Sequence, residues 1–366
     1  MAVLIFSSAF LLACFSYFGY WIVLKMFARK SPTQAISGRR TVSIILAAKN
    51  EAANLEAKLE NLRSLDYPTE LVQIIVVSDG STDETADILA RHPDIDAVFV
   101  PESGGKALAL NRGVACATGE FLFFVDVRQR IDPDALSQLV LSISDPSVGA
   151  VSGELILENA DGTPSKDGLG LYWTIEKSIR RMESDSGSVV GATGAIYLMR
   201  RELFVPLPAG LILDDVLAPM HAARQGYRVL FQPGAVARDC LFEQPGKEFR
   251  RKVRTLTGNL QLLHLAPWLL SFRNPLLARF VSHKLLRLIM PFLLVIMLIS
   301  SALSRSEGMK AILVAQLVFF GLSLMGALSP QTRRWRPISV SYTFVLLNVA
   351  ATIAFYRFLM RDDVWN

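Results

Sequence analysis

The apolar residues of this chain are gathered in long runs at its two ends, with a region of mixed polarity between them. Residues 3–25 are almost wholly apolar up to Lys25. Three more apolar segments lie near 285–303, 310–328 and 338–359. A run of about 20 apolar residues is long enough to cross a lipid bilayer. The pattern therefore predicts one transmembrane helix before the middle region, in residues 1–25, and three after it, in residues 285–360.

The middle region, residues 40–260, alternates two kinds of segment. Short runs that are nearly all apolar and rich in β-branched or aromatic residues lie at 42–48, 72–77, 97–100 and 120–125. Amphipathic stretches such as 52–64 and 81–91 separate them. Runs that are apolar on both faces are typical of strands in a parallel sheet, and strand–helix alternation is typical of a doubly wound fold. We therefore expect an α/β domain here.

Two border segments are apolar but interrupted or ambiguous. Residues 261–280 contain polar residues and prolines, which predicts interfacial helices lying on the membrane. The first apolar run includes "LLAC", ending at Cys14, which resembles the cleavage site of a lipoprotein signal peptide. No basic segment precedes that run, and it continues well past Cys14, so an uncleaved anchor is favoured.

The formal net charge of +5 does not indicate a nucleic-acid partner. Basic residues cluster beside the apolar runs, at 25–40 and 333–336, and form no single stripe with interleaved aromatic residues. Lipid headgroups are the expected partner of such clusters. The positive-inside rule then predicts that residues 26–280 face the cytoplasm at a bacterial inner membrane. The 3 cysteines and 4 histidines are dispersed, without a disulfide framework or zinc-ligand spacing.

Polar side chains follow three of the predicted strands. Asn50 and Glu51 follow the first, Asp79 the second and Asp126 the fourth. The carboxyl ends of parallel strands meet at one edge of a sheet, where ligands bind in open α/β folds. Each residue alone is equally typical of a helix cap or a turn. Three such ends at one edge favour a binding site.

A glycine pair stands directly before Lys106 in "GGKALALNRG" (104–113). Glycines allow close approach of the backbone to a ligand, and lysine supplies a point charge. The spacing is not that of a P-loop, and the Lys-Ser/Thr ending is absent. The segment still predicts a phosphate contact.

Six segments of the middle region resemble, in order, the motifs of membrane-embedded family-2 glycosyltransferases. They read "SIILAAKNEAANL", "VVSDGSTDET", "GGKALALNRG", "FFVDVRQ", "GATGAIYLMRREL" and "ILDDVLAPMHAARQGYRVLF". The chain is similar to the processive synthases of cellulose, chitin, hyaluronan and poly-N-acetylglucosamine. The resemblance covers about residues 40–260. It implies a GT-A fold (a Rossmann-like, mostly parallel sheet), a UDP-sugar donor held with Mg2+ or Mn2+, and transfer with inversion.

On the donor side, the resemblance assigns roles by motif position. Glu51 and Asp79 would contact the uridine, and Lys106 would meet the diphosphate. Asp126 would bind the metal as the first acid of an Asp-x-Asp pair. Oxygen-rich ligation suits Mg2+ and Mn2+, and the diphosphate and water can complete the shell around one protein carboxylate.

On the acceptor side, "ILDDV" matches an acidic pair. Asp215 would act as general base, with Asp214 orienting it or the acceptor, whereas the alternative is that both simply cap a helix. Gly194 and Ala195 would line the acceptor site. Trp173, on an amphipathic stretch, would either stack on a sugar or pack in the core.

Two positions depart from the family pattern. Arg128 stands where the second acid of Asp-x-Asp is expected, so either Asp126 holds the metal with diphosphate and water, or Arg128 itself offsets the diphosphate charge. In "EFRRKVRTLTGN" (248–259), Arg254-Thr255 replaces the Arg-Trp of the processive synthases. We expect Arg254 to keep a basic role toward the diphosphate; a basic patch on the membrane surface is the alternative.

The sequence thus predicts an inverting glycosyltransferase of hexosyltransferase type. It would move a sugar from UDP-sugar to a polysaccharide, oligosaccharide or lipid acceptor at the cytoplasmic membrane face, in exopolysaccharide or cell-envelope glycan synthesis. Auxiliary subunits stay open. The alternative is a membrane-anchored nucleotide-sugar-binding protein with a degenerate site, which Arg128 favours and the Asp214–Asp215 pair opposes. No G-x-G-x-x-G follows the first strand, which disfavours a dinucleotide-dependent oxidoreductase.

Overall fold

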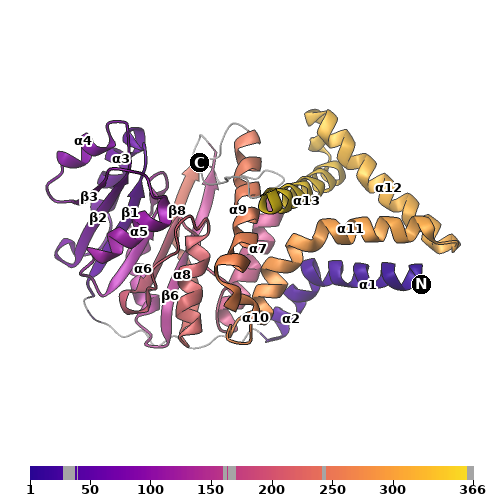
Figure 1. The fold of residues 1–366 in the computed structure, drawn as a ribbon, viewed down its shortest axis with the longest axis horizontal. Coiled ribbons are helices and arrows are strands. Elements are labelled where there is room, and N and C mark those ends of the chain that lie inside the picture. The colour runs from indigo at the N-terminus through magenta and orange to yellow at the C-terminus, as the bar shows by residue number, and fades with distance from the viewer. Residues whose placement is uncertain (28–37, 39, 160–162, 164–169, 241–244, 361–366) are drawn as a thin grey trace.

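The chain folds into an α/β domain with four long apolar helices extending from one side of it (Figure 1). The computed structural model describes residues 1–27, 38, 40–159, 163, 170–240 and 245–360. The sheet of the α/β domain and the apolar helices lie at opposite ends of the molecule's long axis, with helices α7 (Gly170–Asp185) and α9 (Pro245–Leu265) between them.

One sheet of eight strands organises the domain, in the order β3-β2-β1-β4-β7-β6-β8-β5. The strands are β1 Val42–Ala48, β2 Val72–Asp79, β3 Asp96–Val100, β4 Phe121–Val125, β5 Arg130–Ile131, β6 Val148–Glu158, β7 Ile196–Arg200 and β8 Arg228–Cys240. β1 pairs in parallel with β2 and β4, and β2 with β3, whereas β7 is antiparallel to β4 and β6. The loops after β1, β2 and β4 therefore share one edge, and the predicted mostly parallel sheet is confirmed.

The predicted strands at 42–48, 72–77, 97–100 and 120–125 correspond to β1, β2, β3 and β4. The amphipathic stretches between them form α3 (Ala52–Arg63) and α4 (Thr85–Ala90). α4 begins later than the pattern indicates because Asp83 accepts a hydrogen bond from the backbone N–H of Thr85 (3.0 Å). This bond holds the preceding residues in a turn.

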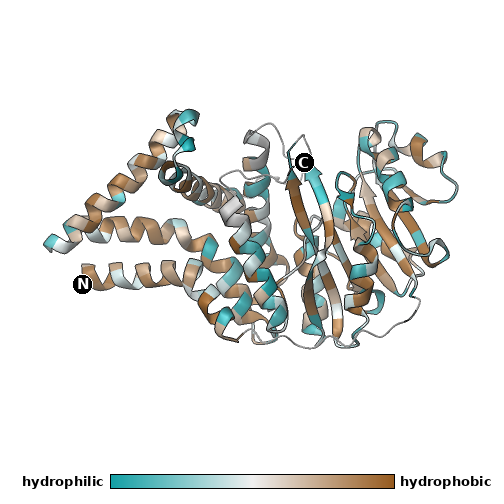
Figure 2. Cartoon of the chain, turned by 180° about the vertical axis from the view of Figure 1, so that it is seen from behind, coloured by the Kyte–Doolittle hydropathy of each residue, from teal (hydrophilic) through white to brown (hydrophobic). Residues whose placement is uncertain are grey.

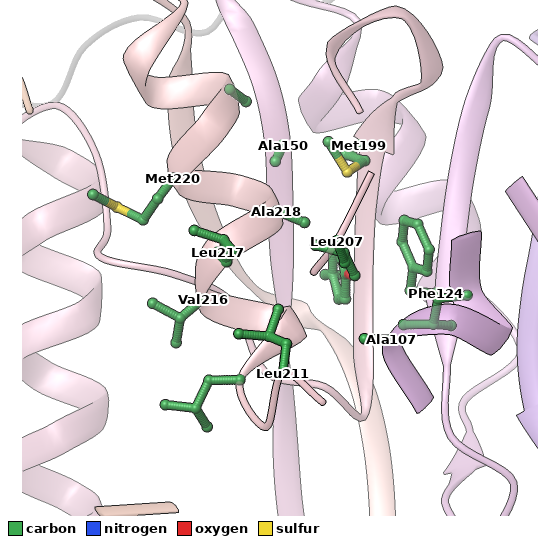
Figure 3. Close-up of a cluster of buried hydrophobic side chains, with 14 of the residues drawn as sticks. Ala107, Phe124, Ala150, Met199, Leu207, Leu211, Val216, Leu217, Ala218 and Met220 are labelled. Atoms are coloured by element: carbon green, nitrogen blue, oxygen red, sulfur yellow. The ribbon is translucent and has the colours of Figure 1, made fainter. Parts of the chain in front are cut away.

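Helices cover both faces of the sheet because its strands alternate buried side chains to either side. Ile45 faces one layer, formed with α5 (Lys106–Ala115) and α8 (Asp214–Arg224), while Ile44 faces the other, formed with α3, α4 and α6 (Ala135–Ile143). Figure 3 shows part of the first layer, to which Leu217 and Ala218 of α8 and Ala150 of β6 belong. This packing fixes the start of α8 against the sheet.

In the described part of the chain, four helices are long and apolar enough to cross a membrane, which is the number that the sequence predicts. We call them the first to fourth apolar helices: Ala2–Phe27, Leu277–Leu303, Glu307–Leu328 and Arg336–Met360. The first apolar helix comprises α1 (Ala2–Cys14), a π-helical turn (Phe15–Gly19) and α2 (Tyr20–Phe27). The second comprises α10 (Leu277–Phe280), a π-helical turn (Val281–Leu285) and α11 (Leu286–Leu303). The third is α12 and the fourth is α13. Figure 2 shows that the residues of these helices are largely hydrophobic.

The second apolar helix begins at Leu277, earlier than the segment 285–303 that the sequence indicates. Before it, α9 ends at Leu265 and one 3-10 turn, Pro267–Leu270, follows. Residues 277–280, expected within an interfacial segment, thus form the first turn of the apolar helix. That residues 261–276 lie on the membrane surface stays a prediction.

Hydrophobic contacts pack the apolar helices onto the α/β domain. Tyr20 and Leu24 of α2 are buried against Ile179 of α7. Val253 of α9 is buried against Ala350 of α13. Both α7 and α9 therefore connect the α/β domain with helices of the membrane-spanning type.

Candidate active site

The loops after β1 and β2 are tied to each other by side chain–backbone hydrogen bonds. Asn50, at φ 54°, accepts a hydrogen bond from the backbone N–H of Thr82 (2.8 Å). The backbone N–H of Ala52 donates to Asp83 Oδ2 (3.0 Å). Glu51 is half-buried in this pair of loops, and its Oε2 accepts from Asn54 Nδ2 (2.8 Å). The structure thus places Glu51 at the predicted strand edge, and its uridine contact stays a prediction.

Asp79 ends β2 and shapes the loop in front of Lys106. It is 4% exposed, and its carboxylate accepts hydrogen bonds from Ser103 Oγ (2.8 Å) and from the backbone N–H groups of Gly104 (2.8 Å) and Gly105 (2.9 Å). Gly80 follows at φ +61°, and a Cβ there would lie 2.4 Å from the backbone nitrogen of Ser103. Asp79 therefore holds the glycine loop, a role that the sequence did not predict beside the uridine contact.

Lys106 lies between two acidic side chains at the centre of the site. Its Nζ is 2.8 Å from Asp126 Oδ1, after β4, and 3.4 Å from Asp214 Oδ2, at the start of α8. Burial lowers the pKa of the Lys106 ammonium, but the negative charges of Asp126 and Asp214 outweigh this effect and the pKa is raised. Lys106 stays protonated. The sequence placed these three residues in one site, and the structure brings them together.

Asp215 stands next to this cluster at the first turn of α8. Its Oδ2 accepts a hydrogen bond from the backbone N–H of Gly194 (2.8 Å), and its backbone oxygen accepts one from Ala192 (2.7 Å). Burial, followed by the negative charge of Asp214, raises the pKa of Asp215 to about 6. Asp215 is half-buried, whereas Asp214 is 3% exposed. The pair therefore consists of Asp214, a buried acid close to Lys106, and Asp215, a more accessible acid whose pKa is raised.

Gly194 lies between the acid and the lysine. A Cβ built on Gly194 would lie 3.4 Å from Asp215 Oδ2 and 3.5 Å from Lys106 Nζ, so any larger side chain would enter the site. Its neighbour Ala195 is 3% exposed and belongs to the core. The side chain of Trp173 lies outside the described part of the structure, so its predicted contact with the acceptor stays untested.

The two basic residues at departures from the family pattern are Arg128 and Arg254. Arg128 Nη2 donates to Asp239 Oδ2 at the end of β8 (3.3 Å), where Gln129 Nε2 also donates (2.8 Å). Arg128 thus has a protein carboxylate as partner. Arg254 is exposed on α9. A diphosphate contact of either residue stays a prediction.

The sequence analysis missed two residues near the site, Lys58 and Gln261. Lys58 of α3 is 2% exposed, and its Nζ donates to the backbone oxygen of Gln129 (2.7 Å). Burial lowers the pKa of Lys58 to about 7, against the opposing charge of Asp126. The signal was available, because Lys58 shares the apolar face of its helix with Leu55 and Leu62.

Gln261 of α9 holds the segment that leads into α8. Its side chain accepts from the backbone N–H of Ile212 (3.1 Å) and donates to the backbone oxygen of Gly210 (3.0 Å). One turn earlier, a Cβ on Gly258 would lie 2.7 Å from Cγ of Leu213. α9 therefore packs directly against the residues preceding Asp214. No local motif in the sequence announces this contact.

The donor set for a divalent cation is incomplete without a ligand. Among the described residues, no group of three or more His, Cys, Asp or Glu side chains is placed to hold a metal ion. Asp126 is nevertheless 37% exposed and already carries a cation, the Lys106 ammonium, on Oδ1. A hard carboxylate oxygen at an open position fits Mg2+ or Mn2+ that also takes diphosphate oxygens and water.

Comparison with solved structures defines the class of the fold. The structure of the mannosyltransferase PcManGT from Pyrobaculum calidifontis, in complex with GDP-Man and Mn2+, superimposes with a TM-score of 0.70. The match covers 98% of this chain and 99% of that chain at 24% sequence identity. The chain therefore has a GT-A-like domain flanked by helices of membrane-spanning type.

A family model matches part of the chain by sequence. Residues 43–206 match the family model described as glycosyl transferase family 2, a range that includes Glu51, Asp79, Lys106, Asp126 and Gly194. This part of the chain is therefore similar to family-2 glycosyl transferase domains.

Curated relatives are polysaccharide synthases. The chain is 26% identical over 261 residues to the poly-beta-1,6-N-acetyl-D-glucosamine synthase of Staphylococcus aureus, covering 67% of this chain and 63% of the relative. The enzyme of that name from Staphylococcus epidermidis is 27% identical over 241 residues, covering 64% and 57%. The chain thus spans less than two thirds of the length of these relatives.

Proposed function

We propose that the chain transfers a sugar from a nucleoside-diphosphate sugar, with UDP as the expected nucleotide, to a hydroxyl of a glycan or lipid acceptor at the cytoplasmic membrane face, with inversion. N-acetylglucosamine is the first sugar to test, because the curated relatives are named as synthases of its polymer. The observation that carries the proposal is Asp215: a half-buried carboxylate with a pKa of about 6, beside the Lys106 cluster.

The donor half of the site neutralises the leaving group. Lys106 is protonated and directly follows the glycine pair Gly104–Gly105, which allows the backbone to approach a ligand closely. Its ammonium can therefore move from Asp126 onto the diphosphate. Asp126 would hold a divalent cation together with diphosphate oxygens and water. When bound, that cation supplies charge neutralisation on the departing diphosphate.

The acceptor half of the site handles the proton. The acceptor hydroxyl oxygen attacks the anomeric carbon on the face opposite the diphosphate, and the carbon–oxygen bond to the diphosphate breaks. The hydroxyl proton passes to Asp215, and the nucleoside diphosphate leaves with the bonding electron pair. The hydrogen bond from Gly194 fixes one carboxylate oxygen of Asp215 (2.8 Å) and leaves the other to act as base.

The alternative, a nucleotide-sugar-binding protein without turnover, has one observation in its favour. Arg128 replaces a metal-binding acid and is paired with Asp239. The purified full-length protein, incubated with UDP-N-acetylglucosamine, other UDP-sugars and GDP-mannose with Mg2+ or Mn2+, separates the two. Release of nucleoside diphosphate that Asp215→Asn abolishes supports transfer. Tight donor binding with no release at any acceptor concentration would establish the binding protein.

The membrane side can be tested with the native cysteines, since Cys116 and Cys240 are exposed on the catalytic domain. We expect an impermeant thiol reagent to label neither in intact cells and both after permeabilisation. The control is Ser306→Cys in a chain lacking the native cysteines, because Ser306 is exposed between the second and third apolar helices. Labelling of Cys116 in intact cells would place the catalytic domain outside.

A further inference from the structure

The segment that leads into the acid pair, residues 204–213, forms neither helix nor strand. Such a segment is positioned by its contacts with other elements. Pro206 and Pro208 stand on either side of Leu207, and proline has no backbone N–H to donate. Leu207 is 3% exposed and belongs, with Ala107 of α5, to the buried cluster in Figure 3. The contacts of Leu207 therefore help to determine how the chain approaches Asp214.

Asn111 of α5 holds Leu207 through two hydrogen bonds. Its Nδ2 donates to the backbone oxygen of Leu207, and its Oδ1 accepts from the backbone N–H of Leu207, both at 2.8 Å. One side-chain amide thus satisfies both backbone groups of a buried residue. Because an unpaired backbone group in the interior is costly, this pair of bonds fixes Leu207 relative to α5.

α5 reaches the acid pair at a second point. The helix begins at Lys106, whose Nζ lies 3.4 Å from Asp214 Oδ2. Lys106 contacts Asp214 directly, while Asn111, on the same helix, holds the segment that precedes Asp214. The distance between the donor helix and the acid pair is therefore set by one ionic contact and by one pair of neutral hydrogen bonds.

The ionic contact is the one that the proposed reaction changes. When the Lys106 ammonium moves onto the diphosphate, Asp214 loses part of the positive charge beside it, although it is only 3% exposed. A buried carboxylate that loses its cation is destabilised where it stands. The bonds of Asn111 to Leu207 involve no charge, so the arrival of the diphosphate leaves them intact. They can hold the acid turn in place during this step.

We propose that Asn111 is a positioning residue for Asp215, which keeps the acid pair at a fixed distance from α5 while Lys106 neutralises the diphosphate. The inference rests on the proposed transfer function and adds a residue that links its donor and acceptor halves. In this role Asn111 acts through Leu207 and the segment up to Asp214, without touching a substrate. Its loss should therefore change the chemical step more than the binding of the donor.

Asn61 of α3 offers a matched control variant. Its Nδ2 donates to the backbone oxygen of Ile131, and its Oδ1 accepts from the backbone N–H of Ile131, both at 2.8 Å. Ile131 is 1% exposed. Asn61→Leu and Asn111→Leu thus remove the same two hydrogen bonds to one buried residue, and we expect similar losses of thermal stability. Only Asn111→Leu loosens the segment that leads to Asp215.

The test measures transfer and donor binding separately in the purified full-length protein. The donor is UDP-N-acetylglucosamine, or the nucleotide sugar of the panel above that the wild type uses, with a dodecyl glycoside as acceptor. We expect Asn111→Leu to lower kcat by about 10-fold, because a misplaced base slows the chemical step. Donor affinity, measured by calorimetry, should stay near wild type in this variant.

The pH dependence of kcat gives a readout that a purely structural role would not move. Burial is the largest cause of the raised pKa of Asp215, so a loosened and better hydrated acid turn should lower this pKa. In Asn111→Leu, activity should therefore rise at a lower pH than the wild-type value of about 6. In Asn61→Leu, the rise should stay at about 6.

A second substitution tests the role if Asn111→Leu fails to fold. Asn111→Asp keeps the shape of the side chain and can still accept from the N–H of Leu207. It places a carboxylate oxygen against the backbone oxygen of Leu207 in place of the donating amide, so one of the two bonds is lost. We expect the same lower kcat and the same shift of the pH dependence.

Combination with Gln261→Leu tests whether the two side chains hold one segment. Asn111 bonds Leu207, and Gln261 bonds Gly210 and Ile212. Residues that act as a unit are not additive, so Asn111→Asp with Gln261→Leu should lower kcat by less than the product of the two single effects. Asn61 and Gln261 share no partner, so Asn61→Leu with Gln261→Leu should give the product.

The outcomes separate this inference from the proposed function. Equal changes of kcat and pH dependence in Asn111→Leu and Asn61→Leu would overturn the positioning role, as would wild-type values in a folded Asn111→Asp protein. A loss of donor affinity with unchanged kcat would assign Asn111 to donor binding and would also overturn it. Transfer itself stands in each of these cases. If the wild type releases no nucleoside diphosphate from any donor of the panel, the proposed function fails and this inference fails with it.

Discussion

Lys106, at the start of α5, and Asp126, after β4, lie on the proposed donor half of the site. Asp215, on the proposed acceptor half, accepts a hydrogen bond from Gly194 and follows a segment that α9 holds through Ile212. The proposed donor half is made by short motifs at one sheet edge. The proposed acceptor half is assembled from segments far apart in the chain. A nucleotide is a constant ligand that short motifs can bind, while a site assembled from distant segments depends on how those segments pack.

Removal of the proposed base, Asp215, should have the largest effect on the transfer rate. We expect Asp215→Asn to lower the transfer rate by roughly 100-fold or more, because a positioned base is lost, while donor affinity stays near wild type. Asparagine keeps the shape and the hydrogen bond from Gly194. Measured kcat with donor binding by calorimetry checks both parts. Normal transfer by a folded Asp215→Asn protein would place the base elsewhere, with Asp214 the next candidate.

The pH dependence of the transfer activity tests the assignment of Asp215 as the base. The pKa of Asp215 is raised to about 6, so the carboxylate is ionised and competent above that pH and protonated below it. Activity should therefore rise with pH through about 6 and then level. The residual activity of Asp215→Asn should lack this limb. An unchanged limb in the variant would assign the titration to another group.

On the proposed donor half, we expect the loss of Asp126 to weaken the binding of the metal ion and of the donor together. Asp126→Ala should abolish metal-dependent donor binding and reduce transfer by about 100-fold, since the cation would lose its protein carboxylate. Titration of Mn2+ against donor binding measures the change. Glu120→Ala is a suitable control, because Glu120 pairs with Arg40 at the start of β4, away from the site. Full wild-type activity in excess chelator would contradict the metal assignment.

A smaller effect is expected from the contact between α9 and the acid turn. Gln261→Leu removes the two hydrogen bonds that hold Gly210 and Ile212, so Asp215 would be less well placed. We expect kcat to fall by about 10-fold with donor KM little changed. Gln225→Leu, which removes a side chain–backbone bond at the other end of α8, should leave kcat near wild type. Equal effects of the two substitutions would indicate general destabilisation.

The sequence predicted the strands of the sheet and a site that joins Lys106, Asp126 and Asp214, while the roles of these residues stay predictions. β1 to β4 were readable because their residues are continuously apolar, and Asp79, Lys106 and Asp126 belong to glycine-marked or strand-end motifs. Asp214 and Asp215 were found through the resemblance. The contact of Gln261 was not predicted, because this residue sits in an ordinary helical pattern and reaches Gly210 and Ile212 only once α9 packs against the segment before α8. Local periodicity contains no information on such a contact.

The smallest expected effect concerns Arg128, which follows Asp126 by two residues and pairs with Asp239. If Arg128 binds the diphosphate, Arg128→Ala should weaken donor binding several-fold and leave metal dependence intact, while Asp239→Asn should leave donor binding unchanged or strengthen it. If its main role is the ion pair with Asp239 (3.3 Å), both substitutions should lower thermal stability slightly and donor affinity hardly at all. Only the Arg128 side of the pair is open to solvent, since Arg128 is 38% and Asp239 8% exposed, so a stability change alone does not distinguish the two roles. Donor affinity in the two single variants therefore decides between the roles, and parallel losses of affinity in both would show that the pair positions the loop carrying Asp126 rather than touching the ligand.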